Sequence, residues 1–282
     1  MSAKRGFFAL GEGSSLFYPG LSYVPGTTFV HRLHPLVKLV VLIVFSLTVL
    51  SRTHYLPGLL LLGFLLVAYK AAGLGFSFFW RKLRIIIIFS FFIFLVQILF
   101  VREGFLLGEI LIWKFRLGIW SGGLLGGMGL ALRFINIIAS SFLFVTVTDP
   151  NRLAYSLMQA GLPYRLGFML ITALRFIPVF HRELNQVRSA QMAKGIELEK
   201  ISWRKLGQYV YYLLIPLVLS ALEKVDFLTV SMESRAFGLY PSRTYLSRHV
   251  ITCVDWLVLV LVLIFFLVFY LYFHFYCPFN FY

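Results

Sequence analysis

Charged residues, and acidic ones above all, are scarce in this sequence. Asp, Glu, Lys and Arg make up 13% of the 282 residues, with 11 acidic against 26 basic ones, while hydrophobic residues reach 60%. Soluble domains have about 45–50% apolar and about 25% charged residues. So little polar surface cannot cover a water-soluble globule, and the composition also excludes a disordered chain, a secreted disulfide scaffold and a coiled coil. The sequence predicts an integral membrane protein.

Cysteine, clustered histidine and aspartate are too sparse for the common reactive and metal sites. Cys253 and Cys277 would lie about 36 Å apart along one helix, so no disulfide is expected within it. The six histidines show no HExxH or Cys/His cluster, and three aspartates exclude an Asp-rich magnesium site. His31 and His34 share a helical spacing, but Pro35 and a loop setting disfavour a metal site. We expect this chain to bind no metal or cofactor and to have no catalytic residue.

A phosphate-binding loop of the form Gly-x-x-x-x-Gly-Lys-Ser/Thr is also missing, so any energy from ATP must come from a partner chain. The glycines between positions 122 and 129 lie in an apolar stretch in which we expect no preceding strand. Gly122 and Gly126, like Gly123 and Gly127, have the spacing of small residues that let membrane helices pack closely. Helix packing is therefore the preferred interpretation of this cluster.

Five windows with few or no charges mark the expected membrane spans: residues 39–51, 53–69, 85–101, 117–148 and 256–282. Residues 85–101 would form a helix of about 25 Å, at the short end of what a bilayer requires. The window 117–148 is too long for one untilted helix, so we expect one span and a broken or re-entrant piece. Residues 209–222 are a candidate sixth span.

Basic residues set the expected orientation of these spans. The formal net charge is +15; four basic residues lie in 70–84 and thirteen in 149–249. Because basic residues accumulate in cytoplasmic loops, both segments are placed in the cytoplasm, with the N-terminus inside and the C-terminus outside the cell membrane. Nucleic acid is not an expected partner. The expected parts are an N-terminal cytoplasmic segment (1–35), transmembrane helices (36–148), an interfacial module (149–249) and a C-terminal transmembrane helix (250–282).

The module 149–249 has the pattern of two long amphipathic helices that end alike. In the first, apolar residues recur every three or four positions from Phe176 to Ala190. It ends at Ala193, Lys194 and Gly195, and the second ends 41 residues later at Ser234, Arg235 and Ala236. One interpretation is an ordinary helix end, in which the cation complements the negative pole of the helix dipole. The other is a pair of exposed cations that dock into acidic grooves.

Two further sets of charged residues have a structural and a functional interpretation. Arg133 is the one charge within its window, and we favour an ion pair or hydrogen bonds to helix-end carbonyls over a ligand contact. Glu223, Lys224 and Asp226 fall within one helical turn, where we expect them to be solvated or paired with one another.

Four further segments form recognisable motifs: residues 173–178 (Ala-Leu-Arg-Phe-Ile-Pro), 188–196, 148–150 (Thr-Asp-Pro) and 232–238 (Met-Glu-Ser-Arg-Ala-Phe-Gly). They resemble the transmembrane (T) component of energy-coupling factor (ECF) transporters, which import vitamins and transition-metal ions and are related to ABC transporters. Residues 31–35 (His-Arg-Leu-His-Pro) with Lys38 are similar to the N-terminal motif His-Arg-Leu-Asp-Pro of that family. The sequence departs from the pattern at Lys194, where Arg is usual, at Ala236, where Gly is usual, and at His34.

The resemblance implies an all-α, polytopic membrane protein with about five transmembrane helices and long amphipathic coupling helices in the cytoplasm. It also implies a non-catalytic subunit whose two motifs each seat in one of two ABC-type ATPases, which use ATP and Mg²⁺. The motif residues would be Ala193, Lys194, Gly195, Ser234, Arg235 and Ala236. A separate substrate-binding membrane (S) subunit would bind a vitamin, or cobalt or nickel. A stand-alone secondary transporter or channel, and an intramembrane enzyme, are the alternatives.

Overall fold

Helices dominate the structure, a computed structural model that describes Tyr23 and residues 26–51, 55–74, 76–102, 104–112, 115–196, 206–240 and 251–276. Most of the predicted segment 1–35 therefore lies outside the described residues, as does Cys277. The helices are α1 (Phe29–Arg32), α2 (Pro35–Ser51), α3 (Tyr55–Ala71), α4 (Phe76–Phe100), α5 (Ser121–Val147), α6 (Pro150–Gln159), α7 (Tyr164–Ala193), α8 (Leu206–Glu233) and α9 (Cys253–Tyr276), and the strands are β1 (Leu106–Ile112) and β2 (Phe115–Trp120). The predicted fold class, an all-α membrane protein, is confirmed, with one β-hairpin added.

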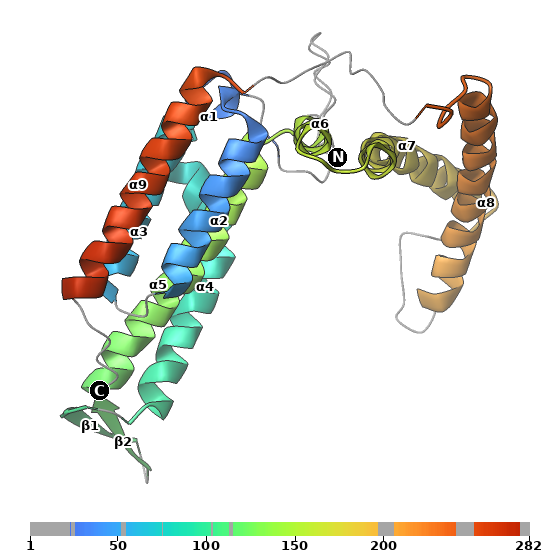
Figure 1. Cartoon of the computed structure of the whole chain (residues 1–282). Coiled ribbons are helices and arrows are strands. Elements are labelled where there is room, and N and C mark those ends of the chain that lie inside the picture. Colours follow the sequence, from blue (N-terminus) through green and yellow to red (C-terminus); the bar gives the residue numbers. More distant parts are fainter. Residues whose placement is uncertain are drawn as a thin grey trace.

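Five apolar helices, α2, α3, α4, α5 and α9, form an elongated bundle (Figure 1). Helix α5 packs against α2, α3 and α4, and α9 packs against α2. The core between them includes Phe45, Leu61, Leu65, Ala139 and Phe266. Many large apolar side chains on the outside of these helices remain exposed, which suits a surface surrounded by lipid rather than by water.

The five bundle helices coincide with the five windows of low charge. Helix α5 and residues Cys253–Phe273 of α9 are long and apolar enough to cross a membrane. Helices α2, α3 and residues Arg84–Phe100 of α4 are apolar but shorter. Seventeen residues give about 25 Å of helix, somewhat less than a hydrocarbon core of about 30 Å. The number of membrane crossings and their direction therefore stay predictions.

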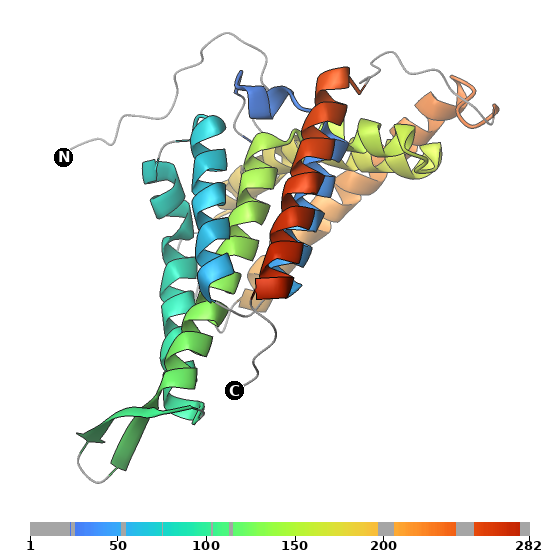
Figure 2. The same cartoon turned by 60° about the vertical axis from the view of Figure 1, so that its left-hand side comes forward.

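The expectation for the window 117–148 is wrong. Its first residues belong to β2, and α5 then runs unbroken from Ser121 to Val147. β2 pairs with β1 in an antiparallel hairpin at the far end of the bundle, with Leu106 opposite Trp120 (Figure 2). Ser121 closes the hairpin, because its Oγ accepts a hydrogen bond from the backbone N of Phe105 at 3.0 Å. A strand thus does precede the glycine cluster, although the phosphate-binding sequence is still missing.

The glycine cluster brings α4 and α5 into close contact, as predicted for one of its two pairs. A Cβ atom at Gly123 would lie 3.0 Å from the carbonyl oxygen of Val101, and one at Gly127 would lie 3.1 Å from Cβ of Gln97. A Cβ at Gly126, in contrast, would have no atom within 4 Å among the described residues. The Gly123 and Gly127 face of α5 therefore packs on α4.

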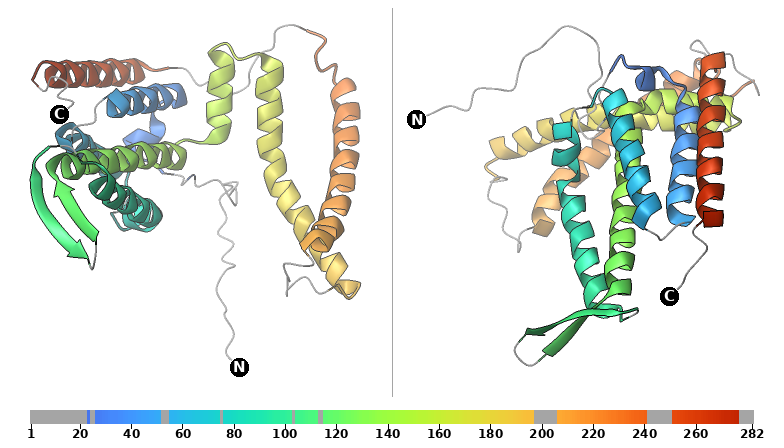
Figure 3. Two further views of the ribbon diagram at one scale, coloured as in Figure 1. Left: turned by 90° about the horizontal axis from the view of Figure 1, so that it is seen from below. Right: turned by 90° about the vertical axis from the view of Figure 1, so that its left-hand side faces the viewer.

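The chain leaves the bundle at the end opposite the hairpin, and α6, α7 and α8 lie beside the bundle (Figure 3). Asp149 is the N-cap residue of α6, since its Oδ1 accepts a hydrogen bond from the backbone N of Asn151 at 2.9 Å. Pro150 follows at the first helical position. Helix α6 packs against α2 and α7, and α7 packs against α8. Both predicted amphipathic helices are continuous, with Pro178 inside α7 and Pro216 inside α8.

Candidate functional site

Helices α7 and α8 are joined near their middle by a polar contact. Glu183 of α7 forms an ion pair with Lys224 of α8, and its other carboxylate oxygen accepts a hydrogen bond from Ser220 at 2.7 Å. The Lys224 hydrogen bond, followed by that of Ser220, holds the pKa of Glu183 below its ordinary value. Lys224 therefore pairs with Glu183 of the other helix, whereas the sequence led us to expect it to be solvated or paired with Glu223 or Asp226.

Contacts on either side of this ion pair show that α7 and α8 run antiparallel. Toward the end of α7, Nε2 of Gln191 donates to the backbone oxygen of Tyr212 at 3.1 Å. Near its start, the ring of Phe168 lies 4.5 Å from the ring of Phe237, which follows α8. The two predicted coupling motifs therefore lie at opposite ends of the pair. About 26 residues of α7 separate them, or about 40 Å of helix.

The two motifs close their helices with the same backbone arrangement. After α7, the N–H of Ile196 donates to the oxygen of Gln191 at 3.2 Å, and that of Gly195 to Met192 at 3.0 Å. After α8, the N–H of Phe237 donates to the oxygen of Met232 at 3.0 Å, and that of Ala236 to Glu233 at 2.9 Å. This pair of bonds defines a Schellman motif, and both bonds recur at the equivalent positions 41 residues later.

Lys194 and Arg235 occupy the same position of this motif, immediately before the left-handed residue. Both side chains are exposed, and neither forms an ion pair or a side-chain hydrogen bond with the part of the chain that the structure describes. Each cation lies at a helix C-terminus, where carbonyl groups without helical partners give a negative potential. Small neighbours, Ala193 and Gly195 around one cation, and Ser234 and Ala236 around the other, leave both accessible.

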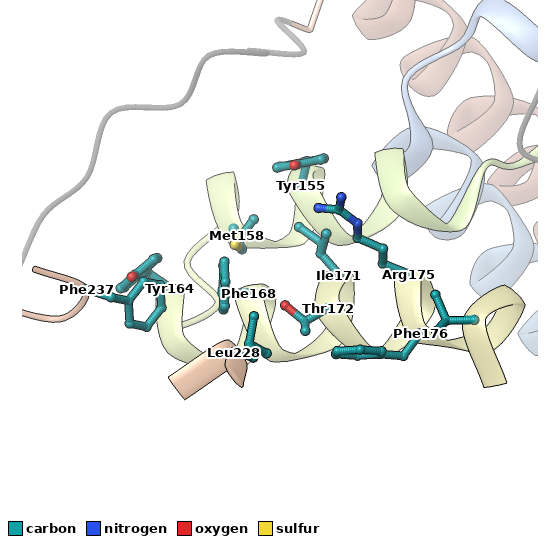
Figure 4. Close-up of a pocket in the computed structure, with 11 residues that line it drawn as sticks. Tyr155, Met158, Tyr164, Phe168, Ile171, Thr172, Arg175, Phe176, Leu228 and Phe237 are labelled. Carbon is teal, nitrogen blue, oxygen red and sulfur yellow. The ribbon is translucent and has the colours of Figure 1, made fainter. Parts of the chain in front are cut away.

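A hollow of about 620 Å³ lies between α6, α7 and the end of α8, close to the second motif (Figure 4). Sequence reasoning missed it, because it depends on the pairing of α7 with α8. Met158 of α6 packs so closely on Gly167 of α7 that a Cβ atom at Gly167 would overlap the Met158 side chain. The hollow is lined mainly by apolar and aromatic side chains, from Tyr155, Met158, Tyr164, Phe168, Ile171, Thr172, Arg175, Phe176, Val179, Leu228 and Phe237.

Arg133 lies within α5, one of the bundle helices. Its Nη2 donates a hydrogen bond to the backbone oxygen of Leu50, near the end of α2, at 3.1 Å. This carbonyl is one of the last four of α2, which have no partner within the helix. The contact is of the kind that the structural interpretation of Arg133 requires, and its role stays a prediction.

The N-terminal motif is tied to two distant parts of the chain. Nζ of Lys38 donates to the backbone oxygens of His31 at 3.0 Å and Val147 at 3.1 Å. The backbone N of His34 donates to Oδ1 of Asp255 at 2.9 Å. Among the described residues, no group of three or more His, Cys, Asp and Glu side chains lies close enough to hold a metal ion. Asp255 was missed by sequence reasoning, because no local pattern links residues so far apart.

Known proteins resemble this chain over most of its length. Residues 26–246 match the sequence family described as "Cobalt transport protein". The chain is 32% identical to the energy-coupling factor transporter transmembrane protein EcfT of Bacillus subtilis (strain 168), over 84% of this chain and 91% of that protein. It belongs to this family. The EcfT proteins of Lactococcus lactis subsp. cremoris and Streptococcus equi subsp. equi are 30% and 29% identical, each over 79% of this chain.

Family membership identifies the chain as the transmembrane component of an ECF transporter, a transport subunit of a membrane complex. The match extends through both coupling motifs and the N-terminal motif, which lie within residues 26–246. The resemblance to the transmembrane component of ECF transporters is thereby confirmed. The substrate, the partner subunits and the coupling mechanism are matters of proposal.

Proposed function

We propose that this chain is the coupling subunit of an ECF-type importer for vitamins or transition-metal ions. In this role it passes conformational change from two ABC-type ATPases, which use ATP and Mg²⁺, to a substrate-binding membrane subunit. The observation that carries the proposal is the repeated helix end: Lys194 and Arg235 lie in equivalent Schellman motifs at opposite ends of α7 and α8. Two like cations in like settings suit two like acceptors.

The distance between the motifs supports two ATPase subunits rather than one. Helices in an antiparallel pair carry their C-terminal ends away from each other, here by about 40 Å of helix. A groove that receives one helix end cannot reach the other over that distance. Each exposed cation would form a charge-assisted hydrogen bond with an acidic group of its own ATPase, and movement of the two ATPases would then rotate or bend α7 and α8.

The apolar surface of α8 supports a partner within the membrane. Large hydrophobic side chains on both sides of Pro216 remain exposed, and soluble monomers rarely expose so continuous a patch. A substrate-binding membrane subunit would cover this face, and the Lys224 and Glu183 contact would hold α7 to the moving helix. The exposed residues are Val210, Tyr211, Tyr212, Leu214, Ile215, Val218, Leu219, Leu222, Val225, Phe227 and Val230.

The proposed place of the chain is the cell membrane, with the N-terminus and helices α6 to α8 on the cytoplasmic side. Thirteen basic residues between positions 149 and 249 support this orientation. In a right-side-out membrane preparation, a cysteine placed at exposed Arg182 should resist labelling by a membrane-impermeant maleimide until the membrane is opened. Labelling of intact vesicles at that position would contradict the orientation.

Reversal of both coupling charges tests the proposed function. The double variant Lys194→Glu, Arg235→Glu loses two charge-assisted bonds, each of about 1.5–3 kcal/mol, and should lose both ATPases on purification together with ATP-driven uptake. Arg182→Glu, which reverses an exposed charge on α7 outside the motifs, is the matched control and should retain them. Co-purification of the ATPases with the double variant at wild-type yield, with uptake retained, would refute the proposal. Substrate uptake by the chain alone, without ATP, would favour a stand-alone transporter.

A further inference from the structure

The junction between α5 and α6 is the point at which the coupling helices join the bundle. Lys38 of α2 bonds to it directly, and Asp255 of α9 bonds to the residue that precedes α2. We propose that Lys38 and Asp255 are positioning residues for energy coupling. They form a clamp, defined as Lys38, His34, Thr252, Asp255 and the backbone oxygen of Val147, that fixes this junction to the bundle. The proposal rests on the proposed function, because it concerns how movement of α7 and α8 reaches the membrane helices.

Lys38 ties the end of α5 to the start of α2. Its ammonium group donates to Val147, the last residue of α5, and to His31, in the last turn of α1. Both acceptors lie at helix C-terminal ends, where backbone carbonyls lack helical partners and a cation is favoured by the dipole. Val147 is 2% exposed, and its hydrogen bond with Lys38 is partly buried. One side chain therefore joins three helix ends.

Asp255 ties the start of α9 to the start of α2. Its Oδ1 accepts a hydrogen bond from the backbone N of His34 at 2.9 Å. Its Oδ2 accepts from the backbone N of Thr252 at 2.9 Å and from Oγ1 of Thr252 at 2.6 Å. The carboxylate thus accepts from the residue immediately before α2 and from the one immediately before α9, the second bond being that of the third helical residue in a capping box, and only 6% of Asp255 is exposed. Helices α2 and α9 are held in register at the end from which α6 departs.

The clamped junction is short and leads directly to the coupling helices. Only Thr148 and Asp149 separate α5 from α6, and Thr148 is 4% exposed. Helix α6 packs against both α2 and α7, so a displacement of α7 also displaces α6. With the clamp intact, the end of α5 stays fixed to the bundle, and the movement of α6 is transmitted to α2, α5 and α9. Without it, backbone rotation at Thr148 and Asp149 would absorb the movement.

This role differs from one in stability alone, because it predicts ATP hydrolysis without transport. The test uses the full complex, reconstituted into liposomes with its ATPases and substrate-binding subunit, and measures substrate taken up per ATP hydrolysed. Lys38→Met removes the ammonium donor at similar length, and Asp255→Asn keeps the shape but turns a donor toward Thr252. Lys70→Met, which alters an exposed lysine at the end of α3, is the matched control.

We expect both clamp variants to retain the ATPases at wild-type stoichiometry and to hydrolyse ATP at nearly the wild-type rate. Uptake per ATP should fall about tenfold or more, as expected for the loss of one charge-assisted hydrogen bond, while the control remains unchanged. An unchanged ratio of uptake to hydrolysis would overturn the proposal, and so would a parallel loss of both. If a clamp variant fails to assemble, Thr252→Val, which removes one hydroxyl hydrogen bond, decides through the same ratio.

A distance measurement separates failure of the clamp from failure of the proposed function. Spin labels at exposed Leu59 on α3 and Arg182 on α7 should report two defined distances in the wild-type complex, one with and one without nucleotide. In Lys38→Met the distance between the labels should no longer depend on nucleotide, and both conditions should give the same broad distribution of distances. An unchanged shift would overturn the clamp even where the ATPases still bind, whereas loss of ATPase binding belongs to the Lys194 and Arg235 variants.

Discussion

Gly195 and Ala236 occupy the same left-handed position in the two coupling motifs, with φ angles of +83° and +54°. Each donates its N–H to the carbonyl three residues earlier and so closes its helix. Glycine adopts this conformation freely, whereas a Cβ atom makes it unfavourable by about 1–2 kcal/mol. Ala236, which departs from the family pattern, therefore leaves the end of α8 with backbone strain beside Arg235. The end of α7 has no such strain, because Gly195 occupies the equivalent position.

Exchanging the residue at this position should change the two ends in opposite directions. Ala236→Gly should strengthen its helix end by about 1 kcal/mol, and Gly195→Ala should weaken its own by a similar amount. A Cβ at Gly195 meets no described atom within 4 Å, so backbone strain alone acts there. Hydrogen exchange of the Phe237 and Ile196 amides measures both effects. Protection that changes in the same direction in the two variants would contradict this assignment.

The two cations should contribute unequally to ATPase binding. Arg235 can present a planar fork to a carboxylate, whereas Lys194 presents a single ammonium group. Lys194→Arg should therefore tighten the complex and Arg235→Lys should weaken it, each by a few-fold, about 1 kcal/mol or less. Dissociation constants of the ATPase subunits, measured at fixed salt, test this order. If Arg235→Glu costs less affinity than Lys194→Glu, the assignment of the stronger site to Arg235 is wrong.

The α7 and α8 pairing should weaken in acid because of Glu183. Its pKa lies below the ordinary value of 4.5, since Lys224 and Ser220 donate hydrogen bonds to the ionised form. A carboxylate of this kind stabilises the folded state above its unfolded pKa, and the contribution is lost as the pH falls through its folded pKa. Wild type should therefore melt at a higher temperature than Glu183→Gln near pH 7, and the difference should shrink as the pH falls below 4.5 and through the lowered pKa of Glu183. A difference independent of pH would exclude the ion pair as its cause.

Helix α5 should tolerate an added methyl group at Gly126 but not at Gly123, which faces α4. A Cβ at Gly123 would lie 3.0–3.3 Å from backbone atoms of Val101, Gln97 and Ile98, which cannot rotate away. Gly123→Ala should lower stability by about 1–3 kcal/mol, as overpacking does. Gly126→Ala, with no described atom within 4 Å, should have little effect or raise stability slightly. Thermal unfolding in detergent compares the two, and equal loss at both sites would contradict the packing.

Much of the fold follows from local chemistry in the sequence. The scarcity of charge in five windows predicted the bundle helices, because burial in lipid excludes charge residue by residue. The ends of α7 and α8 were predicted from a cation followed by a small residue, since the Schellman motif is a local backbone structure. Both signals act over a few residues, so neither depends on the arrangement of the rest of the chain.

Features that depend on distant pairing could not be predicted in this way. The β-hairpin replaces the expected re-entrant piece, because β2 forms only by pairing with β1 outside the window considered. Lys224 was expected to be solvated or paired within its own turn, and its contact with Glu183 requires the antiparallel arrangement of α7 and α8. The clamp between Lys38 and Val147 likewise joins residues 109 positions apart.

The hydrogen bond from His34 to Asp255 has a consequence for the order in which the protein is made. The two residues are 221 positions apart, so the start of α2 leaves the ribosome long before its capping carboxylate exists. At typical synthesis rates the delay is roughly ten to forty seconds. Through that interval α2 lacks its acceptor, and the first helix of the bundle reaches its final structure only when the last one arrives. A nascent chain truncated before α9 should therefore remain incompletely assembled, however many of its membrane helices have already inserted.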